Sequence, residues 1–402
     1  MPFASERIAV LGAGLQGSCI AFELAARGAC VDLYERNATC VAEASACNEG
    51  KIHLGYVYAH DETLRTARLM AEGALCFEAL LRRWLGDGHR GLVPSSPFRY
   101  VVHRDSLITP EEFGAYAGAV AEMITERSGR SGSGYFGRPP GRPPQRLADW
   151  PDDDPGTIAA VFATEEIAID PEDLAVAVRA RIESEPEIRL LASREVVSVG
   201  ERSGALTVRS RRGKDEDAEG YDYVVNALGT GRVAIDLGLG IKPPRPWLYR
   251  FKYFLRGEVD PEAYLPSTTM VLGPFGDIVR HMSNMAYLSW YPAGLAGWST
   301  DARPPPMPTV LCGAEADRIG NGILDGLATV VPEVTRIALG EPAVKGGWIY
   351  ALGKTDIDDP ASELHQRTGP GIVRHGRYLT VDTGKFTLAP LFAECVVEML
   401  RA

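Results

Sequence analysis

The sequence of 402 residues lacks several features that mark other classes of protein. No window approaches the roughly 18 apolar residues that a membrane span needs, so we expect no transmembrane helix. The first residues contain no basic segment followed by an apolar one, so we expect no signal peptide and a cytoplasmic protein. The seven cysteines form no CxxC pair and the seven histidines form no HExxH motif, so we predict free thiols and no metal.

Positive charge is also scarce, because 42 lysines and arginines face 53 acidic residues and give a net charge of -11. This balance disfavours binding to nucleic acid or to an anionic membrane surface. Any anionic substrate must therefore be bound by local cationic groups.

A nucleotide-binding pattern lies near the start of the chain. It consists of an apolar strand at residues 8–11, the sequence GAGLQG at 12–17, a helix to about residue 27 and a second strand at 31–34. The first glycine permits a tight turn, the second permits close approach of a pyrophosphate, and the third lets the helix pack on the strand. Glu35 ends the second strand, where a carboxylate accepts hydrogen bonds from ribose hydroxyls. A chance glycine-rich turn is the alternative, but the order of these parts predicts dinucleotide binding.

The middle of the chain alternates regular segments with loops. A long amphipathic helix is predicted over residues 62–85, and the Gly, Pro and Ser content of residues 128–156 predicts a long loop. Asp170 is expected to cap a helix that begins at Pro171. Strands are expected at 189–191, 195–199 and 206–209, followed by a polar turn, RRGKDEDAEG.

The second half combines a buried strand with an antiparallel sheet. Residues 223–228 resemble a buried parallel strand that ends in a glycine turn, and residues 245–300 alternate aromatic and apolar residues as antiparallel strands do. A strand at 378–381 and a helix at about 389–400 are expected at the end. The length favours two interleaved domains.

Three further segments resemble the D-amino acid oxidase (DAO) superfamily of FAD-dependent oxidoreductases. ASACNEGKIHLGYVYA at 44–59 is similar to the loop that crosses the FAD pyrophosphate, most closely in the hydroxyacid-oxidising branch (2-hydroxyglutarate oxidase-like motifs). DYVVNALGTG at 222–231 resembles the family's strand near the flavin, and TVDTGKFTLAP at 380–390 resembles the C-terminal motif of glycerol-3-phosphate dehydrogenase relatives. Asp382 and Thr383 depart from that motif, which leaves the branch undetermined.

The resemblance implies FAD as cofactor and an α/β chain, α+β overall, in which a Rossmann-type FAD-binding domain is interleaved with an antiparallel-sheet substrate domain. We assign residues 1–95, 157–240 and 340–402 to the first domain, and 96–156 and 241–339 to the second. The predicted cofactor-binding residues are Gly12, Gly14, Leu15, Gln16, Gly17, Glu35, Arg36, Ser45, Asn48, Gly50, Lys51, Ile52, Val197, Ala227, Gly229, Gly384, Lys385, Phe386 and Thr387.

The catalytic and substrate residues are expected where cations and imidazoles meet the flavin. His53 and His281 are candidate bases, although His53 also fits a hairpin core, and Lys385 would stabilise negative charge on reduced flavin. Arg280 first and Arg250 second are candidates for binding a substrate carboxylate, with a surface ion pair as the alternative. Tyr287, Trp290 and Tyr291 are expected to form an aromatic wall over the flavin, with the packed core of a sheet as the alternative.

These residues predict an oxidase or dehydrogenase that removes a hydride from a C–N or C–OH carbon of a small amino acid, amine or 2-hydroxy acid. Oxygen or another acceptor would take the electrons. The alternatives are an FAD-dependent monooxygenase that uses NADPH, disfavoured because no Gly-Asp-Ala motif is found, and a non-catalytic flavoprotein.

Overall fold

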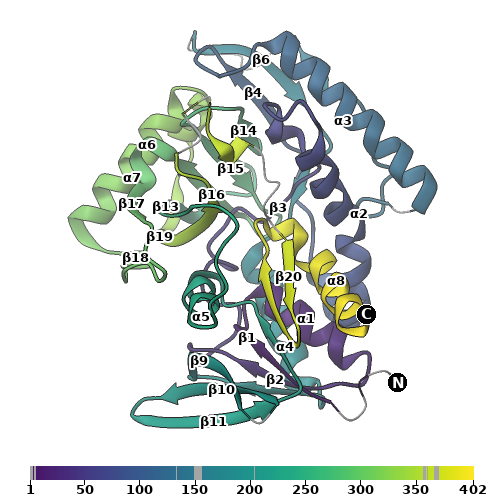
Figure 1. The fold of residues 1–402 in the computed structure, drawn as a ribbon. Coiled ribbons are helices and arrows are strands. Elements are labelled where there is room, and N and C mark those ends of the chain that lie inside the picture. The colour runs from purple at the N-terminus through teal and green to yellow at the C-terminus, as the bar shows by residue number, and fades with distance from the viewer. Residues whose placement is uncertain are drawn as a thin grey trace.

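The computed structural model describes residues 3, 6–132, 134–148, 156–202, 204–355, 359, 361–365 and 371–402. A six-stranded sheet and a ten-stranded sheet organise this part of the chain. In the view of Figure 1 most of the smaller sheet lies below the larger sheet, and helix α2 lies beside the larger one. No helix in these ranges is long and apolar enough to cross a membrane.

The six-stranded sheet is parallel except at one edge, where β20 pairs antiparallel with β21. Its strands, in order across the sheet, are β20 (Gly371–His375), β21 (Tyr378–Asp382), β12 (Tyr223–Asn226), β1 (Arg7–Leu11), β2 (Cys30–Tyr34) and β8 (Ile188–Leu191). The predicted strand, glycine turn, helix and second strand at residues 8–35 are therefore confirmed as a Rossmann-type unit.

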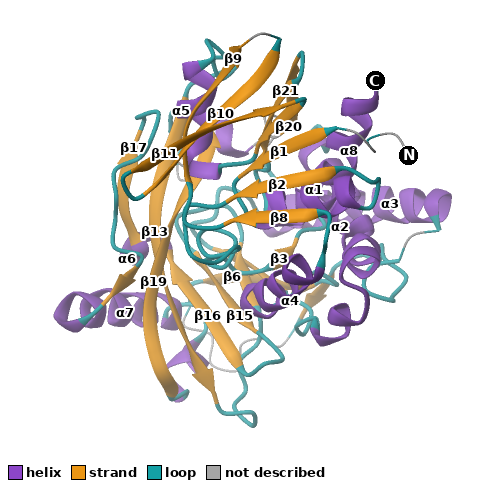
Figure 2. Ribbon diagram, turned by 90° about the horizontal axis from the view of Figure 1, so that it is seen from below, coloured by secondary structure: helices purple, strands orange, loops and turns teal. Residues whose placement is uncertain are grey.

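Both faces of this sheet are covered by other elements. Successive side chains of β1 point to opposite sides, so they show what each face packs against. Ile8 and Val10 pack in the cluster of the helices, and Ala9 and Leu11 pack against a three-stranded sheet. Figure 2 shows these two layers on either side of the strands. The helices are α1 (Leu15–Ala25), α2 (Arg65–Leu85), α4 (Pro171–Ser184) and α8 (Ala389–Arg401); the other layer holds β9 (Glu195–Arg202), β10 (Ala205–Arg212), β11 (Asp215–Tyr221) and α5 (Arg232–Gly238).

The ten-stranded sheet is centred on β13 (Trp247–Val259), a 13-residue strand whose alternate side chains face the smaller sheet and helix α7. Its strands run in the order β18 (Val310–Leu311), β19 (Leu339–Leu352), β13, β16 (Met285–Trp290), β15 (Gly276–Arg280), β14 (Thr268–Met270), β4 (Arg99–His103), β6 (Ile158–Ala163) and β5 (Gln145–Leu147), and β17 (Leu295–Ser299) also pairs with β13. The helices beside it are α3 (Pro110–Ser131), α6 (Tyr291–Gly294) and α7 (Gly313–Ala328).

A small two-stranded sheet of β3 (Lys51–Ile52) and β7 (Ile167–Ala168) lies between the large ones. Short 3-10 helices complete the described part of the chain: η1 (Tyr56–Tyr58), η2 (Gly86–Gly91), η3 (Gly229–Gly231), η4 (Pro332–Arg336), η5 (Glu363–His365) and η6 (Phe386–Leu388).

Several predicted elements agree with the structure. Helix α4 begins at Pro171, and the Asp170 side chain caps it by accepting a 3.0 Å hydrogen bond from the Glu172 amide. The predicted helix at 62–85 begins three residues late, at Arg65. The antiparallel strands expected over 245–300 are present, together with α6 and with β14, which pairs parallel with β4.

Other expectations were wrong. The polar turn expected in RRGKDEDAEG is a hairpin, because Gly213 (φ 62°) allows a tight turn and β11 then pairs along β10. Within the expected loop at 128–156, helix α3 continues to Ser131 and β5 forms at Gln145–Leu147, while residues 133 and 149–155 lie outside the described residues.

The strands also divide differently from the predicted domains. Strand β6, and β19 except for its first residue Leu339, fall within ranges assigned to the cofactor domain, yet both strands belong to the ten-stranded sheet. Strand β19 pairs with β13 over most of its length, from Leu352 opposite Trp247 to Leu339 opposite Val259. This long ladder fixes β19 in the larger sheet.

Candidate active site

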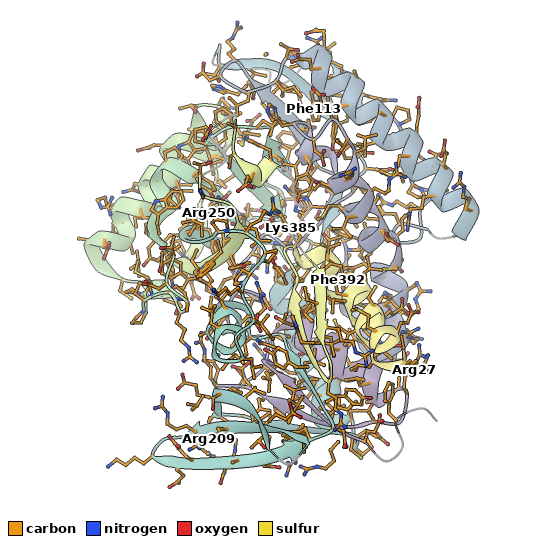
Figure 3. All side chains as sticks on the ribbon, viewed as in Figure 1. Arg27, Phe113, Arg209, Arg250, Lys385 and Phe392 are labelled. Atoms are coloured by element: carbon orange, nitrogen blue, oxygen red, sulfur yellow. The ribbon has the colours of Figure 1, made fainter. Side chains whose placement is uncertain are left out.

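A cavity of about 500 Å³ is lined by residues of both large sheets. Figure 3 shows two of its lining residues, Arg250 and Lys385, near the junction of the two halves of the molecule. The predicted residues that line it are Gly12, Gly14, Leu15, Gln16, Glu35, Arg36, Ser45, Asn48, Lys51, His53, Ala227, Gly229, Arg250, Tyr287, Gly384, Lys385 and Phe386. The cavity therefore extends from the glycine motif to the inner face of β13.

The three motif glycines have distinct surroundings. Gly12 has a φ of 94°, and a Cβ there would lie 2.8 Å from the Ala227 carbonyl oxygen. A Cβ on Gly17 would lie 1.8 Å from the Gly12 carbonyl oxygen, so the helix can start this close to the strand only with glycine. Gly14 lines the cavity, and the nearest atom to a Cβ added there would be the Ser45 hydroxyl oxygen at 3.1 Å. The turn thus leaves open space at the N-terminus of α1, where a phosphate is stabilised.

The carboxylate of Glu35 lies at the end of β2 and lines the same cavity. It accepts hydrogen bonds from the backbone N–H of Ala13 at 3.1 Å and of Asn37 at 2.8 Å. Burial raises its pKa above the usual range, although these hydrogen bonds oppose the shift. The neighbouring Arg36 pairs with Glu43, with a 2.8 Å bond from its Nε.

The loop after residue 43 is fastened to the start of α1 by short polar contacts. The Ser45 hydroxyl accepts a 2.9 Å hydrogen bond from the Leu15 amide, and Asn48 donates to the Ser45 carbonyl at 2.9 Å. Asn48 also accepts from the Gly50 amide at 2.8 Å. Gly50 packs where a Cβ would lie 1.9 Å from the Ile169 carbonyl oxygen, so it supports the loop without lining the cavity.

The C-terminal motif meets this loop from the other side. Residues 384–386 line the cavity directly before η6 and α8. Thr387 is fully buried behind them, where its hydroxyl accepts from the His53 amide at 2.8 Å and donates to the Lys51 carbonyl at 3.2 Å. Two segments more than 300 residues apart in the sequence are thereby held together.

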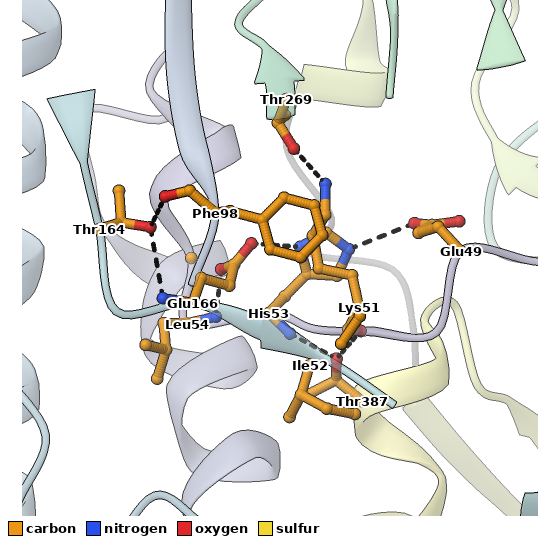
Figure 4. A network of polar contacts seen from close by, with 12 residues as sticks. Glu49, Lys51, Ile52, His53, Leu54, Phe98, Thr164, Glu166, Thr269 and Thr387 are labelled. Carbon is orange, nitrogen blue, oxygen red and sulfur yellow. Dashed lines mark hydrogen bonds and ion pairs between the residues drawn. The ribbon is translucent and has the colours of Figure 1, made fainter. Parts of the chain in front are cut away.

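The imidazole of His53 lies between two carboxylates, as Figure 4 shows. Its Nδ1 is 3.5 Å from Oε1 of Glu166, and its Nε2 is 3.7 Å from Oε1 of Glu49. Glu166 in turn accepts hydrogen bonds from the Leu54 amide at 2.6 Å and from the Tyr100 hydroxyl. The imidazole is thus held between two carboxylates, and both of its nitrogens are buried next to the cavity that His53 lines.

A buried ion pair lies beside the imidazole. The Lys51 ammonium donates to Asp277 at 2.7 Å and to the Thr269 hydroxyl, and Thr269 donates to Asp277 at 2.9 Å. Burial by itself lowers the pKa of Lys51, but the carboxylates of Asp277 and Glu166 outweigh it and raise the pKa above its usual range. Lys51 therefore remains charged at neutral pH.

The inner face of β13 forms the other wall. Arg250, Lys252 and Phe254 alternate along the strand and all line the cavity. Arg250 donates a hydrogen bond to the Tyr291 hydroxyl, and the Lys252 ammonium lies 4.5 Å from the centre of the same ring. Burial lowers the pKa of Lys252. Phe254 stacks on Tyr287 with ring centres 4.6 Å apart, so an aromatic surface adjoins the cations.

The expected positions of Arg280 and His281 were wrong. Asp277 lines the cavity, so Arg280, three residues further along β15, points to the opposite face. Its guanidinium donates to the Asp260 carbonyl at 3.0 Å and to the Asn284 side chain at 3.2 Å. His281 lies beyond the end of the strand, is buried, and does not line the cavity either.

Two further residues also point elsewhere. The ring centres of Trp290 and Phe275 are 6.1 Å apart, and Trp290 also packs against Gly326 of α7. Trp290 therefore belongs to the core between the larger sheet and α7. Val197 is 40% exposed, whereas its neighbour Val196 lines the cavity, because adjacent residues of β9 face opposite sides. Ile52, like Gly17 and Gly50, is outside the lining.

Several lining or adjacent groups were not predicted as site residues. Lys252 could have been found by continuing the strand alternation from Arg250, and Glu49 lies within the polar loop that was predicted to contact the cofactor. Asp277 and Glu166 carry no local signal in the sequence. They reach the site only through the pairing of distant strands.

Comparison with known proteins agrees with this geometry. A family model described as FAD dependent oxidoreductase (DAO) matches residues 7–397. No curated protein matches the sequence.

Solved structures share the fold at low identity. Glycine oxidase from Geobacillus kaustophilus superposes with a TM-score of 0.69 at 17% identity, covering 98% of this chain and 95% of that one. L-proline dehydrogenase from P. horikoshii superposes with a TM-score of 0.66 at 17% identity, covering 100% of this chain and 94% of that one. Dithionite-reduced L-alpha-glycerophosphate oxidase from Mycoplasma pneumoniae, with FAD bound, superposes with a TM-score of 0.64 at 14% identity, covering 99% of this chain and 95% of that one.

Proposed function

The chain belongs to the DAO family of FAD-dependent oxidoreductases, and on this premise we propose that it removes a hydride from a C–N or C–OH carbon of a small carboxylate-bearing substrate. The substrate would be an amino acid, an amine with a carboxylate, or a 2-hydroxy acid. One observation carries the proposal: a single cavity joins the glycine motif to a buried arginine on β13. Oxygen or another acceptor would then take the electrons.

The residues at the motif end of the cavity fit FAD. The open space at Gly14 and the N-terminus of α1 suit a pyrophosphate, and Glu35 retains lone pairs that can accept from ribose hydroxyls. Residues 384–386 precede the N-terminus of α8, where Lys385 adds positive charge at the cavity. When bound, FAD supplies the two-electron acceptor that no side chain provides.

Arg250 is the proposed carboxylate ligand. Its side chain is 2% exposed, lines the cavity and is steadied by the hydrogen bond to Tyr291. A guanidinium presents parallel N–H donors that match the two oxygens of a carboxylate. Lys252, two residues further on the same face, adds a second cation, and the stacked rings of Phe254 and Tyr287 provide an apolar surface in the same cavity.

His53 is the proposed proton acceptor. Oxidation of an alcohol or an amine releases a proton from oxygen or nitrogen as the hydride leaves carbon, and the unprotonated nitrogen of a neutral imidazole can accept that proton. His53 lines the cavity, and its backbone N–H donates a hydrogen bond to Thr387.

The test is anaerobic reduction of the purified yellow protein by a panel of amino acids, N-methyl amino acids and 2-hydroxy acids, followed at the flavin absorption band. Bleaching by one class identifies the substrate and supports the proposal. Bleaching only with NADPH favours a monooxygenase, and a colourless protein that FAD does not reconstitute contradicts the proposal.

A further inference from the structure

Glu166 is a fully buried carboxylate directly behind the imidazole of His53. It lies between β6 and β7 and does not line the cavity, so it is out of reach of a substrate. An ionisable group in such a position requires hydrogen-bond partners, because an unpaired buried charge is costly.

The partners of Glu166 all present hydrogens to it. The Leu54 amide, which can only donate, bonds to Oε2 at 2.6 Å, and the Tyr100 hydroxyl donates to Oε1. Burial by itself raises the pKa of Glu166, but His53, Lys51 and Tyr100 together bring it below the usual range. Glu166 is therefore an ionised carboxylate that only accepts, and the third group facing it, Nδ1 of His53, is favourable there when it carries a hydrogen.

The other side of the imidazole faces Glu49. Nε2 is 3.7 Å from Oε1 of Glu49, which lines the cavity as His53 does. The hydrogen bond from the His53 amide to Thr387 at 2.8 Å fixes the main chain. Both ring nitrogens are buried, but Nδ1 faces the fully enclosed Glu166, whereas Nε2 faces Glu49, whose side chain is 23% exposed and lines the cavity. The charged and titratable groups around the ring are Glu49, Lys51, Tyr58, Tyr100, Glu166 and Lys385.

We propose that Glu166 is a positioning residue that keeps a proton on Nδ1 of His53, so that Nε2 accepts the proton released by the substrate. This inference rests on the proposed role of His53 and goes beyond it. In the step, the substrate O–H or N–H bond breaks, its electron pair stays on the heteroatom, and a new N–H bond forms at Nε2. Glu166 itself exchanges no proton and balances the imidazolium that results.

A Glu166→Gln substitution tests the proposal because it replaces the carboxylate oxygen that faces His53, which only accepts hydrogen bonds, with an NH₂ group that donates them. The amide oxygen is needed by the Leu54 N–H, so the NH₂ group of the glutamine faces Tyr100 and His53. When this NH₂ donates to Nδ1, the neutral imidazole carries its hydrogen on Nε2 instead. Nε2 then has no free lone pair and cannot act as a base.

The primary measurement is the ¹⁵N NMR spectrum of histidine-labelled holoenzyme, with the His53 signal assigned by its loss in His53→Asn. We expect the Nδ1–H tautomer in the wild type and in the matched control Glu49→Gln, and the Nε2–H tautomer in Glu166→Gln. The rate of anaerobic flavin reduction should fall about 10²-fold or more in Glu166→Gln, with little change in substrate affinity. Glu166→Asp, which still only accepts, should restore the Nδ1–H tautomer.

An Nε2–H tautomer or an imidazolium at neutral pH in the wild type would overturn the proposal, as would an unchanged tautomer in a folded Glu166→Gln. If Glu166→Gln does not fold, the wild-type and Glu166→Asp spectra still decide. Because the tautomer is read without a substrate, failure of this inference is separate from failure of the substrate panel.

Discussion

The guanidinium of Arg250 on β13 donates a hydrogen bond to the phenol oxygen of Tyr291, which lies 41 residues further along the chain at the start of α6. Lys252, on the same face of β13, contacts the same ring. Tyr291 thus contacts Arg250 and Lys252, the two cations of this strand that line the cavity. A substrate carboxylate bound there would point its reacting carbon away from β13.

Arg250→Lys should lower kcat/KM about 10- to 100-fold with most of the change in KM, because a lysine keeps the charge but loses the two parallel donors. Steady-state kinetics with the substrate found in the panel provides the measurement. Arg280→Lys is the control, since Arg280 lies on the other face of its sheet and should leave kcat/KM unchanged. Equal losses in the two variants would contradict the assignment.

The motif glycines should separate folding from cofactor binding. In Gly17→Ala the new Cβ would lie 1.8 Å from a backbone oxygen, so we expect strong destabilisation even without FAD. In Gly14→Ala it meets only a side-chain hydroxyl at 3.1 Å, so the protein should fold with a similar melting temperature but bind FAD more weakly. Thermal unfolding of the apoprotein and the flavin content after purification distinguish the two. A stable Gly17→Ala apoprotein would refute the close contact.

The buried pair of Arg256 and Asp170 should stabilise the contact between β13 and the start of α4. Their side chains are 2.9 Å apart and nearly inaccessible to solvent. Removing one partner leaves a buried charge, so Arg256→Ala should lower the free energy of unfolding by about 3–5 kcal/mol. Urea unfolding gives this value, and Arg209→Ala, which breaks the exposed pair with Glu216, should change it by less than about 1 kcal/mol.

The glycine motif and Glu35 could be predicted because their chemistry is local. All parts of the pattern lie within 28 residues, and each glycine has its own steric reason. The C-terminal segment around Lys385 was found only through a resemblance, since nothing in its composition points to the loop near residue 50 that it contacts.

The remaining site residues depend on strand phase and on pairing. A one-residue error in phase moves a side chain to the other face, which is why Arg280 and Trp290 were placed in the cavity while Asp277 was missed. The contact of Lys51 with Asp277 joins residues 226 positions apart, and that of Leu54 with Glu166 joins residues 112 apart. Periodicity within one segment carries no information about such partners.

His281 should make the protein less stable in mild acid. Burial lowers its pKa to about 4, against a smaller opposing effect of Asp170, and neither ring nitrogen has a hydrogen-bond partner among the described residues. Arg256 and Glu172 are the other charged groups that act on the ring. Since the unfolded chain binds the proton near pH 6.5 and the folded protein only near pH 4, stability falls as the pH drops between these values.

His281→Leu removes this titration because it replaces the imidazole with an apolar side chain of similar size. The two proteins should therefore differ in the slope of the free energy of unfolding against pH. The wild type should lose up to about 3 kcal/mol more than the variant between pH 6.5 and pH 4, and the difference should be constant above pH 7. Urea unfolding across this range measures both slopes under the same conditions, so that the titration of carboxylates common to both proteins cancels. Parallel curves would show that His281 is accessible to protons in the folded state, and that the core between β15 and α4 opens more readily than its burial indicates.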